Sequence, residues 1–167
     1  IETLVPQFNT DRMLRQYFAE MYTPSAERGV ALSADHHLLA RTITDWKRKV
    51  PMRFSSLRII DVSVEGIHGD TIPVGKPFAV RVRIDPGKTD PAELLVELVL
   101  GKSDGVDFID PPECLNLELV EKQKDQILIF AAEHTVTENG RYSYGIRVMP
   151  HHPSLASKQD AELILWG

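Results

Sequence analysis

The sequence predicts a mainly β fold in which two α-helices precede an antiparallel β-sandwich of about seven strands. Apolar side chains recur with the helical period of about 3.6 residues in the first third of the chain, and from about Arg58 the period changes to 2. Turn-forming Gly, Pro, Asn and Asp residues separate the later segments. Because no helical stretch lies between the predicted strands, a parallel sheet built from βαβ units is not expected.

The first predicted helix spans about residues 10–22. Asn9 supplies an N-cap and Asp11 an acidic first turn, and both features stabilise the start of a helix. Pro24 is expected to end this helix, because a proline inside a helix has no N–H to donate and clashes with the preceding turn.

The first predicted helix carries more apolar surface than a single contact requires. Its apolar side chains cover about half of the helix circumference: Met13, Leu14, Tyr17, Phe18, Met21 and Tyr22. A helix that packs against one sheet needs an apolar arc of only about 100°. We therefore expect this helix to contact two bodies, and we predict a docking face that consists of Met13, Tyr17, Phe18 and Met21.

A second helix is predicted over about residues 34–49, with Ser33 as its N-cap and Pro51 at its end. It carries a narrow apolar stripe: Leu32, Leu39, Ile43, Trp46 and Val50. Strands follow soon after this helix. We therefore expect two domains, a helical segment over residues 1–54 and a β-sandwich over residues 55–167.

Seven segments with two-residue alternation are predicted as strands. They cover about residues 58–64, 78–84, 94–100, 115–119, 127–132, 142–148 and 162–166. Seven short alternating strands with turns between them are typical of an immunoglobulin-like sandwich. In that fold Tyr142, which follows the turn Asn139-Gly140, is predicted to be a tyrosine corner at the start of the sixth strand.

The composition is that of a globular protein, with 43% hydrophobic and 26% charged residues. The net charge of −5 argues against binding to nucleic acid or to anionic membranes, because both need a basic surface. No apolar run approaches the roughly 18 residues of a transmembrane helix. The single cysteine, Cys114, forms no internal disulfide, which fits a cytoplasmic location.

No catalytic, cofactor-binding or metal-binding residue is predicted. The sequence has no Gly-rich phosphate loop, no nucleophile elbow and no HExxH motif. Cys114 is interpreted as a structural thiol, because no suitable histidine lies near it in the sequence. Adjacent histidines point apart on a helix or a strand, so neither of the two pairs is expected to hold a metal: His36-His37 and His151-His152.

One loop concentrates acidic side chains, namely Asp104, Asp107, Asp110 and Glu113. Calcium-binding loops place their oxygen ligands at about every second residue around a central glycine. Here the acidic residues are three apart. The segment is therefore interpreted as a solvated loop, and a weak cation site in the folded protein stays open as the alternative.

A carbohydrate-binding sandwich would need exposed aromatic rings, because sugar rings stack on aromatic faces. Trp46 lies on the apolar stripe of the second helix and Trp166 ends an apolar strand, so both are expected in the core. Among the aromatic side chains of the predicted strands, Tyr144 and Trp166 are the candidates for a sugar platform. No dedicated sugar-binding motif accompanies them.

Three segments together resemble one known family. Residues 8–17 read FNTDRMLRQY and residues 20–24 read EMYTP, which resembles the C-terminal signature of bacterial α-glucan phosphorylases of the glycogen and maltodextrin type. Residues 44–47, TDWK, look like the second helix of that family. Residues 140–153 and the ending LWG are similar to the close of the family's β-rich tail.

The resemblance implies a parent enzyme that is a glycosyltransferase with a pyridoxal phosphate cofactor. Such an enzyme transfers glucosyl units from the non-reducing end of an α-1,4-glucan to phosphate and releases glucose 1-phosphate. The family's cofactor-lysine, glucan and phosphate motifs do not occur in this sequence, so no catalytic or cofactor residue is carried over. The chain begins with Ile1 rather than Met, so we expect a piece of a longer protein.

We therefore expect a non-catalytic C-terminal domain that serves domain packing, assembly or glucan targeting. Its expected partner is the catalytic domain of the parent chain, because the family's first helix packs onto that body. Binding of α-glucan and self-association stay open. The alternatives are a stand-alone carbohydrate-binding β-sandwich, which requires an exposed aromatic platform, and a protein-interaction module, which requires a contiguous apolar patch.

Overall fold

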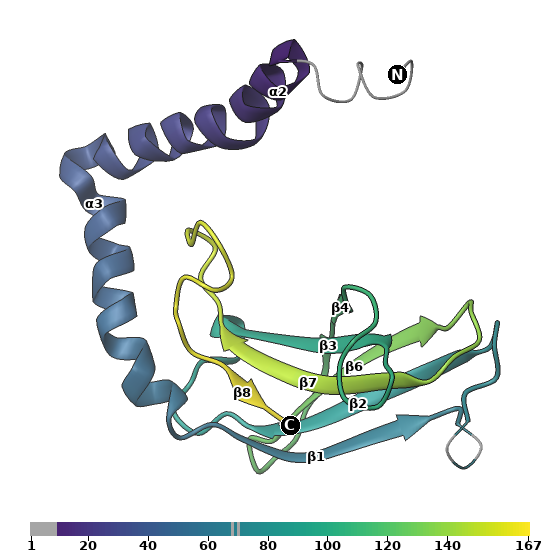
Figure 1. Ribbon diagram of the computed structural model, residues 1–167. Helices are drawn as coiled ribbons and strands as arrows, with labels where there is room; N and C mark the ends of the chain where they lie inside the picture. The colour runs from purple at the N-terminus through teal and green to yellow at the C-terminus, as the bar shows by residue number, and fades with distance from the viewer. Residues whose placement is uncertain (1–9, 68, 70) are drawn as a thin grey trace. The chain divides into compact units, whose positions relative to one another are not determined.

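The computed structural model describes residues 10–67, 69 and 71–167 (Figure 1). These residues form two compact units, a helical unit and a β unit, which divide between Trp46 and Lys47. Each unit is described by itself. Within the described residues, no helix is both long enough and apolar enough to cross a membrane.

The helical unit begins with α2 (Thr10–Tyr17), which passes into a π-helical turn, η1 (Phe18–Tyr22). These two elements confirm the first predicted helix, and its predicted N-cap, Asn9, lies outside the described residues. The next helix, α3 (Thr23–Phe54), follows without a break and continues into the β unit. No residue of α2 or η1 is buried.

Pro24 and Pro51 are each predicted to end a helix, but neither does. Pro24 lies in the first turn of α3, where a proline is tolerated. The turn before it is π-helical, because the N–H of Thr23 donates to the carbonyl of Phe18, five residues earlier, rather than to that of Ala19, four residues earlier. Pro51 lies inside α3, which ends only at Phe54.

The start of the second predicted helix is a kink within α3. The backbone of Ala34–His37 leaves the helical conformation, and three of its residues have positive φ angles between 47° and 63°. Ser33 is not an N-cap, because its hydroxyl donates to the carbonyl of Gly29, 2.8 Å away in the preceding turn. Helical structure therefore extends over residues 23–33, which the sequence analysis left outside both helices.

The β unit contains eight strands among its described residues. They are β1 (Arg58–Glu65), β2 (Pro77–Asp85), β3 (Leu94–Lys102), β4 (Glu113–Asn116), β5 (Glu118–Lys122), β6 (Leu128–Thr135), β7 (Tyr142–Pro150) and β8 (Leu165–Trp166). A short 3₁₀ helix, η2 (Pro91–Glu93), precedes β3. The strands form two antiparallel sheets of four, with the orders β1-β2-β6-β5 and β4-β3-β7-β8 (Figure 1).

The additional strand comes from a segment that was predicted as one strand, residues 115–119. In the structure β4 pairs with β3 in one sheet, and β5 pairs with β6 in the other. Only Leu117 lies between them; it is buried, and its N–H donates to the carbonyl of Val96 over 2.8 Å. The chain thus changes sheets across one residue.

The two sheets share one hydrophobic core. It consists mainly of alternate residues from the central strands β2, β3, β6 and β7: Val80, Val82, Ile84, Val96, Leu98, Leu128, Phe130, Ile146 and Val148. Burial of one such side chain stabilises a fold by about 1.5–3 kcal/mol. The inward side chains of these strands account for the two-residue period of the sequence.

Tyr142 lies at the start of β7. Its hydroxyl donates to the backbone carbonyl of Glu138, 3.2 Å away and four residues upstream. A bond from the tyrosine hydroxyl to the backbone a few residues upstream is typical of a tyrosine corner. The strand that Tyr142 opens is the seventh and not the sixth, because the predicted fourth strand is in fact two strands.

Candidate functional site

The docking face lies on α2 and η1. Between 44% and 62% of each of its side chains is exposed: Met13, Tyr17, Phe18 and Met21. The spacing of these residues along the helix places them on one side. The ring of Phe18 also contacts that of Tyr22, with 5.5 Å between the ring centroids. The described residues therefore present these apolar side chains to solvent on one side of the helix.

A buried carboxylate in β3 organises the outward side of the sheet β4-β3-β7-β8. Glu97 is only 2% exposed. Its carboxylate accepts hydrogen bonds from Arg147 of β7, over 3.0 Å from Nε and 2.5 Å from Nη2. Lys158, in the loop between β7 and β8, donates to the other carboxylate oxygen over 2.6 Å. One buried acid thus holds two basic side chains on this side of the sheet.

The two cations determine the charge state of Glu97. Burial by itself raises the pKa of this carboxyl group, but the hydrogen bonds from Lys158 and Arg147 outweigh that effect and leave the pKa below its ordinary value. The sequence pattern does not reveal this cluster, because Glu97 lies within an otherwise apolar predicted strand. A lone carboxylate in such a strand signals a basic partner, since buried charges are normally paired.

Trp166 continues this row of side chains. It lies directly opposite Arg147 in the pairing of β7 with β8, so the two side chains lie on the same side of the sheet. The guanidinium carbon of Arg147 is 5.7 Å from the centre of the indole ring. Because 56% of Trp166 is exposed, its predicted place in the core is wrong, whereas the other tryptophan, Trp46, is buried as predicted.

The two candidates for a sugar platform are equally exposed but lie on opposite sides of their sheet. Tyr144 pairs with Leu100, a buried member of the core, so its side chain starts from the inward side of β7. Trp166 lies on the outward side with Arg147. The structure therefore does not bring Tyr144 and Trp166 onto one surface.

The acidic loop is organised by its own backbone. Asp104 accepts hydrogen bonds from the N–H groups of Asp107 and Val106, over 3.0 and 2.8 Å, and these bonds lower the pKa of its carboxyl group.

Cys114 is an exposed free thiol, 3.4 Å from Nη2 of Arg147. No group of three potential metal ligands occurs among the residues that the structure describes.

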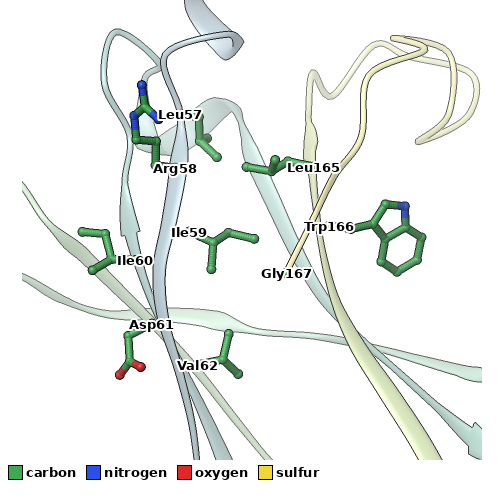
Figure 2. Close-up of a pocket in the computed structure, with 9 residues that line it drawn as sticks. All are labelled: Leu57, Arg58, Ile59, Ile60, Asp61, Val62, Leu165, Trp166 and Gly167. Atoms are coloured by element: carbon green, nitrogen blue, oxygen red, sulfur yellow. The ribbon is translucent and has the colours of Figure 1, made fainter.

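An open groove of about 580 Å³ lies between the edge strands β1 and β8 (Figure 2). Its lining comes from residues 57–62 and 165–167 and is largely apolar. Figure 2 shows that Leu165 faces the groove, whereas the indole ring of Trp166 points away from it. Among the described residues that line the groove, Arg58 and Asp61 are the only charged ones, and none is a histidine or a cysteine.

Comparison with protein families gives one match over the β unit. The family model described as "Glycogen phosphorylase C-terminal domain" matches residues 55–167. The match covers every strand of both sheets, together with the cluster around Glu97 and the exposed Trp166.

Similarity to individual proteins extends over almost the whole chain. A glycogen phosphorylase of Mycobacterium tuberculosis (strain H37Rv) and one of Mycobacterium bovis are each 25% identical over 164 residues, which cover 98% of this chain. A maltodextrin phosphorylase of Thermococcus litoralis is 25% identical over 170 residues and covers 99% of it. The chain spans only 19% of the length of each of these relatives.

Proposed function

Because the chain belongs to the glycogen phosphorylase C-terminal domain family, we propose that it is the non-catalytic accessory domain of an α-glucan phosphorylase. The relatives it matches are named glycogen phosphorylase and maltodextrin phosphorylase. We expect the longer protein to release glucose 1-phosphate from α-1,4-glucan with pyridoxal phosphate as its cofactor, in the cytoplasm. We assign this chemistry to parts of the protein outside the present chain.

The accessory role rests on one observation, the exposed docking face of α2 and η1. Its four side chains form an apolar stripe, and exposed apolar patches of this kind usually mark a contact with another body. The proposed occupant is the catalytic part of the same protein, because the chain matches only about a fifth of its relatives. In that arrangement the stripe fixes the β unit to the catalytic part.

For the β unit we propose an immunoglobulin-like sandwich. In that fold one sheet has the strand order A-B-E-D and the other contains C, F and G. If the strands are lettered along the chain with β4 as an added strand next to C, both observed orders agree with this arrangement. The hydrogen bond from Tyr142 to Glu138 supports the same proposal, because a tyrosine corner belongs at the start of strand F.

A double substitution on the docking face tests the accessory role. In the full-length phosphorylase, Phe18→Glu combined with Met21→Glu places two carboxylates in the proposed contact. We expect limited proteolysis to release the β unit at least about tenfold faster, because an uncompensated buried charge costs several kcal/mol. The control is Val120→Glu, which changes an exposed apolar residue of β5.

Equal cleavage rates for the double variant and for Val120→Glu would contradict the accessory role. A second copy of the chain as the occupant would instead produce dimers of the isolated chain that depend on concentration in analytical ultracentrifugation. The isolated chain is also expected to release no glucose 1-phosphate from α-glucan, and release of that product would contradict its assignment as non-catalytic.

A further inference from the structure

Two aromatic rings lie on glycines of neighbouring strands in the sheet β4-β3-β7-β8. At Gly101 of β3, a β-carbon would lie 2.8 Å from the ring of Phe108, closer than real side chains approach. At Gly145 of β7, it would lie 3.5 Å from the ring of Trp166. These four residues, Gly101, Phe108, Gly145 and Trp166, are called the ring platform.

Both rings lie on the outward side of the sheet. Gly101 pairs with Ser143, which is two residues from Gly145, so the two glycines are on the same side. Such diagonal neighbours in an antiparallel pair are about 7–8 Å apart. The ring platform therefore presents two separate aromatic rings, called its seats, one over β3 and one over β7.

The rings are accessible although each contacts a strand on one side. Trp166 is 56% exposed and Phe108 is 40% exposed. An aromatic face is apolar and carries partial negative charge, so it attracts the C–H groups of a sugar ring and removes them from water. At Gly101 the absence of a side chain allows the ring of Phe108 to lie close to the sheet, whereas at Gly145 a β-carbon would be in ordinary contact with Trp166.

Hydrogen-bonding groups adjoin the ring platform. Arg147 contacts the indole ring of Trp166, and its contacts with Glu97 and Cys114 engage Nε and Nη2. A guanidinium has five N–H donors and an ammonium three, so Arg147 and Lys158 have donors beyond those that hold Glu97. The hydroxyl of Ser143 belongs to the same side of β7. Donors beside aromatic faces suit a ligand rich in hydroxyl groups.

The charges beside the platform favour a neutral polymer over a protein partner. Glu97 is paired with Arg147 and Lys158, and Arg147 contacts the ring of Trp166, so charges of both signs lie together on this side of the sheet. Charged residues are depleted from the cores of protein interfaces, where they would lose water without a matched partner. A neutral sugar chain can accept hydrogen bonds from these groups without displacing the ion pairs.

We propose that the ring platform binds a linear α-1,4-glucan chain. The choice of this sugar rests on the proposed function, because the family relatives are glycogen and maltodextrin phosphorylases. Trp166 and Phe108 stack on two glucose units of one chain, while Arg147 and Lys158 donate to its hydroxyls. Since a longer chain covers both seats, affinity increases from maltose to maltoheptaose.

The test is a titration of the 167-residue chain with maltose, maltoheptaose and glycogen, followed by amide and indole NMR signals. Trp46 is buried and Trp166 is exposed, so their two indole N–H signals report on different environments. We expect saturable shifts of the Trp166 indole and of the Gly145 amide, with tighter binding of maltoheptaose than of maltose. Cellohexaose, the β-1,4 analogue, is expected to bind at least about tenfold more weakly, because its extended chain follows a different path.

Matched variants locate the site. Trp166→Ala is expected to weaken maltoheptaose binding at least about tenfold, as observed through the Gly145 amide, because one of two stacking faces is lost. Phe108→Leu removes the other ring but keeps an apolar side chain over Gly101, so the fold is retained and binding is weakened. Tyr144→Ala is the control, because Tyr144 is equally exposed but belongs to the opposite side of the sheet.

The proposal would be overturned if about 10 mM maltoheptaose, well above a millimolar dissociation constant, caused no saturable shifts. It would also be overturned if the Tyr144 and Trp166 variants lost affinity equally. Protection of Trp166 by the catalytic part of the enzyme would contradict it as well, because the platform would then be a protein interface. The accessory role is tested separately, because the Phe18 and Met21 substitutions do not touch the platform. Glucan binding that persists in that double variant keeps the two proposals distinct.

Discussion

The helical unit and the β unit use apolar side chains in different ways. In α2 and η1 no residue is buried, although half of the helix circumference is apolar. In the β unit, apolar side chains of both sheets meet in one core. The β unit thus has within itself the interactions that stabilise a fold, whereas the apolar stripe of the helical unit gains stability only when another body covers it. Apolar composition alone does not distinguish these two situations.

The largest expected effect contrasts a core residue with a residue of the docking face. Ile146→Ala removes a side chain with no exposed surface, so we expect the free energy of unfolding to fall by about 2–5 kcal/mol. Phe18→Ala in the isolated chain is expected to change it by less than about 0.5 kcal/mol. Urea denaturation of both variants measures the difference. Similar losses would mean that the docking face is covered within the chain itself.

Ion pairs provide a second comparison between the β unit and the helical unit. Glu97→Ala leaves Arg147, whose side chain is 14% exposed, without its carboxylate, and we expect a loss of about 3 kcal/mol. Asp11 and Arg15 form an exposed pair of 2.8 Å in α2, and Asp11→Ala is expected to cost at most about 0.5 kcal/mol. Urea denaturation near neutral pH measures both losses. Equal effects would show that burial adds nothing to the pair in the β unit.

The pH dependence of the Glu97 effect follows from its lowered pKa. The contribution of Glu97 is complete above the pKa of an unfolded glutamate, about 4.3, and it disappears as the pH falls through the lower pKa of the folded state. The difference in unfolding free energy between wild type and Glu97→Gln should therefore shrink below about pH 4. A difference that stays constant down to pH 2 would exclude an ionised Glu97.

The smallest expected effect concerns two tyrosine hydroxyls. Tyr142→Phe removes the hydrogen bond to the carbonyl of Glu138, and we expect a loss of about 0.5–1.5 kcal/mol. Tyr17→Phe makes the docking face slightly more apolar and is expected to leave the stability of the isolated chain unchanged. Thermal unfolding of the two variants compares them. A loss below about 0.3 kcal/mol for Tyr142→Phe would argue against a stabilising corner.

The two-residue alternation predicted most of the strands correctly, because one side of each central strand faces the core. It did not reveal the change of sheets at Leu117, since Leu115, Leu117 and Leu119 keep the same alternation across the junction. The prolines misled the helix prediction for a different reason. Pro24 lies in the first turn of α3 after a π-helical turn, and Pro51 lies within α3; neither position is visible in a residue pattern.

The docking face and the ring platform also differ in how far the sequence predicts them. Exposure of the docking face follows from the width of its apolar stripe, which the sequence shows directly. The ring platform depends on which residues are neighbours across strands and loops, and the fold places Phe108 of the β3–β4 loop over Gly101 and Trp166 of β8 over Gly145. The sequence placed Trp166 and Tyr144 together as candidates, because without strand register the two sides of the sheet cannot be separated.

A single residue, Leu117, connects the two sheets. Because a single residue separates β4 from β5, neither sheet can shift against the other without breaking the hydrogen bond between Leu117 and Val96 or the strand pairs on either side. We therefore expect the two sheets to unfold together as one cooperative unit.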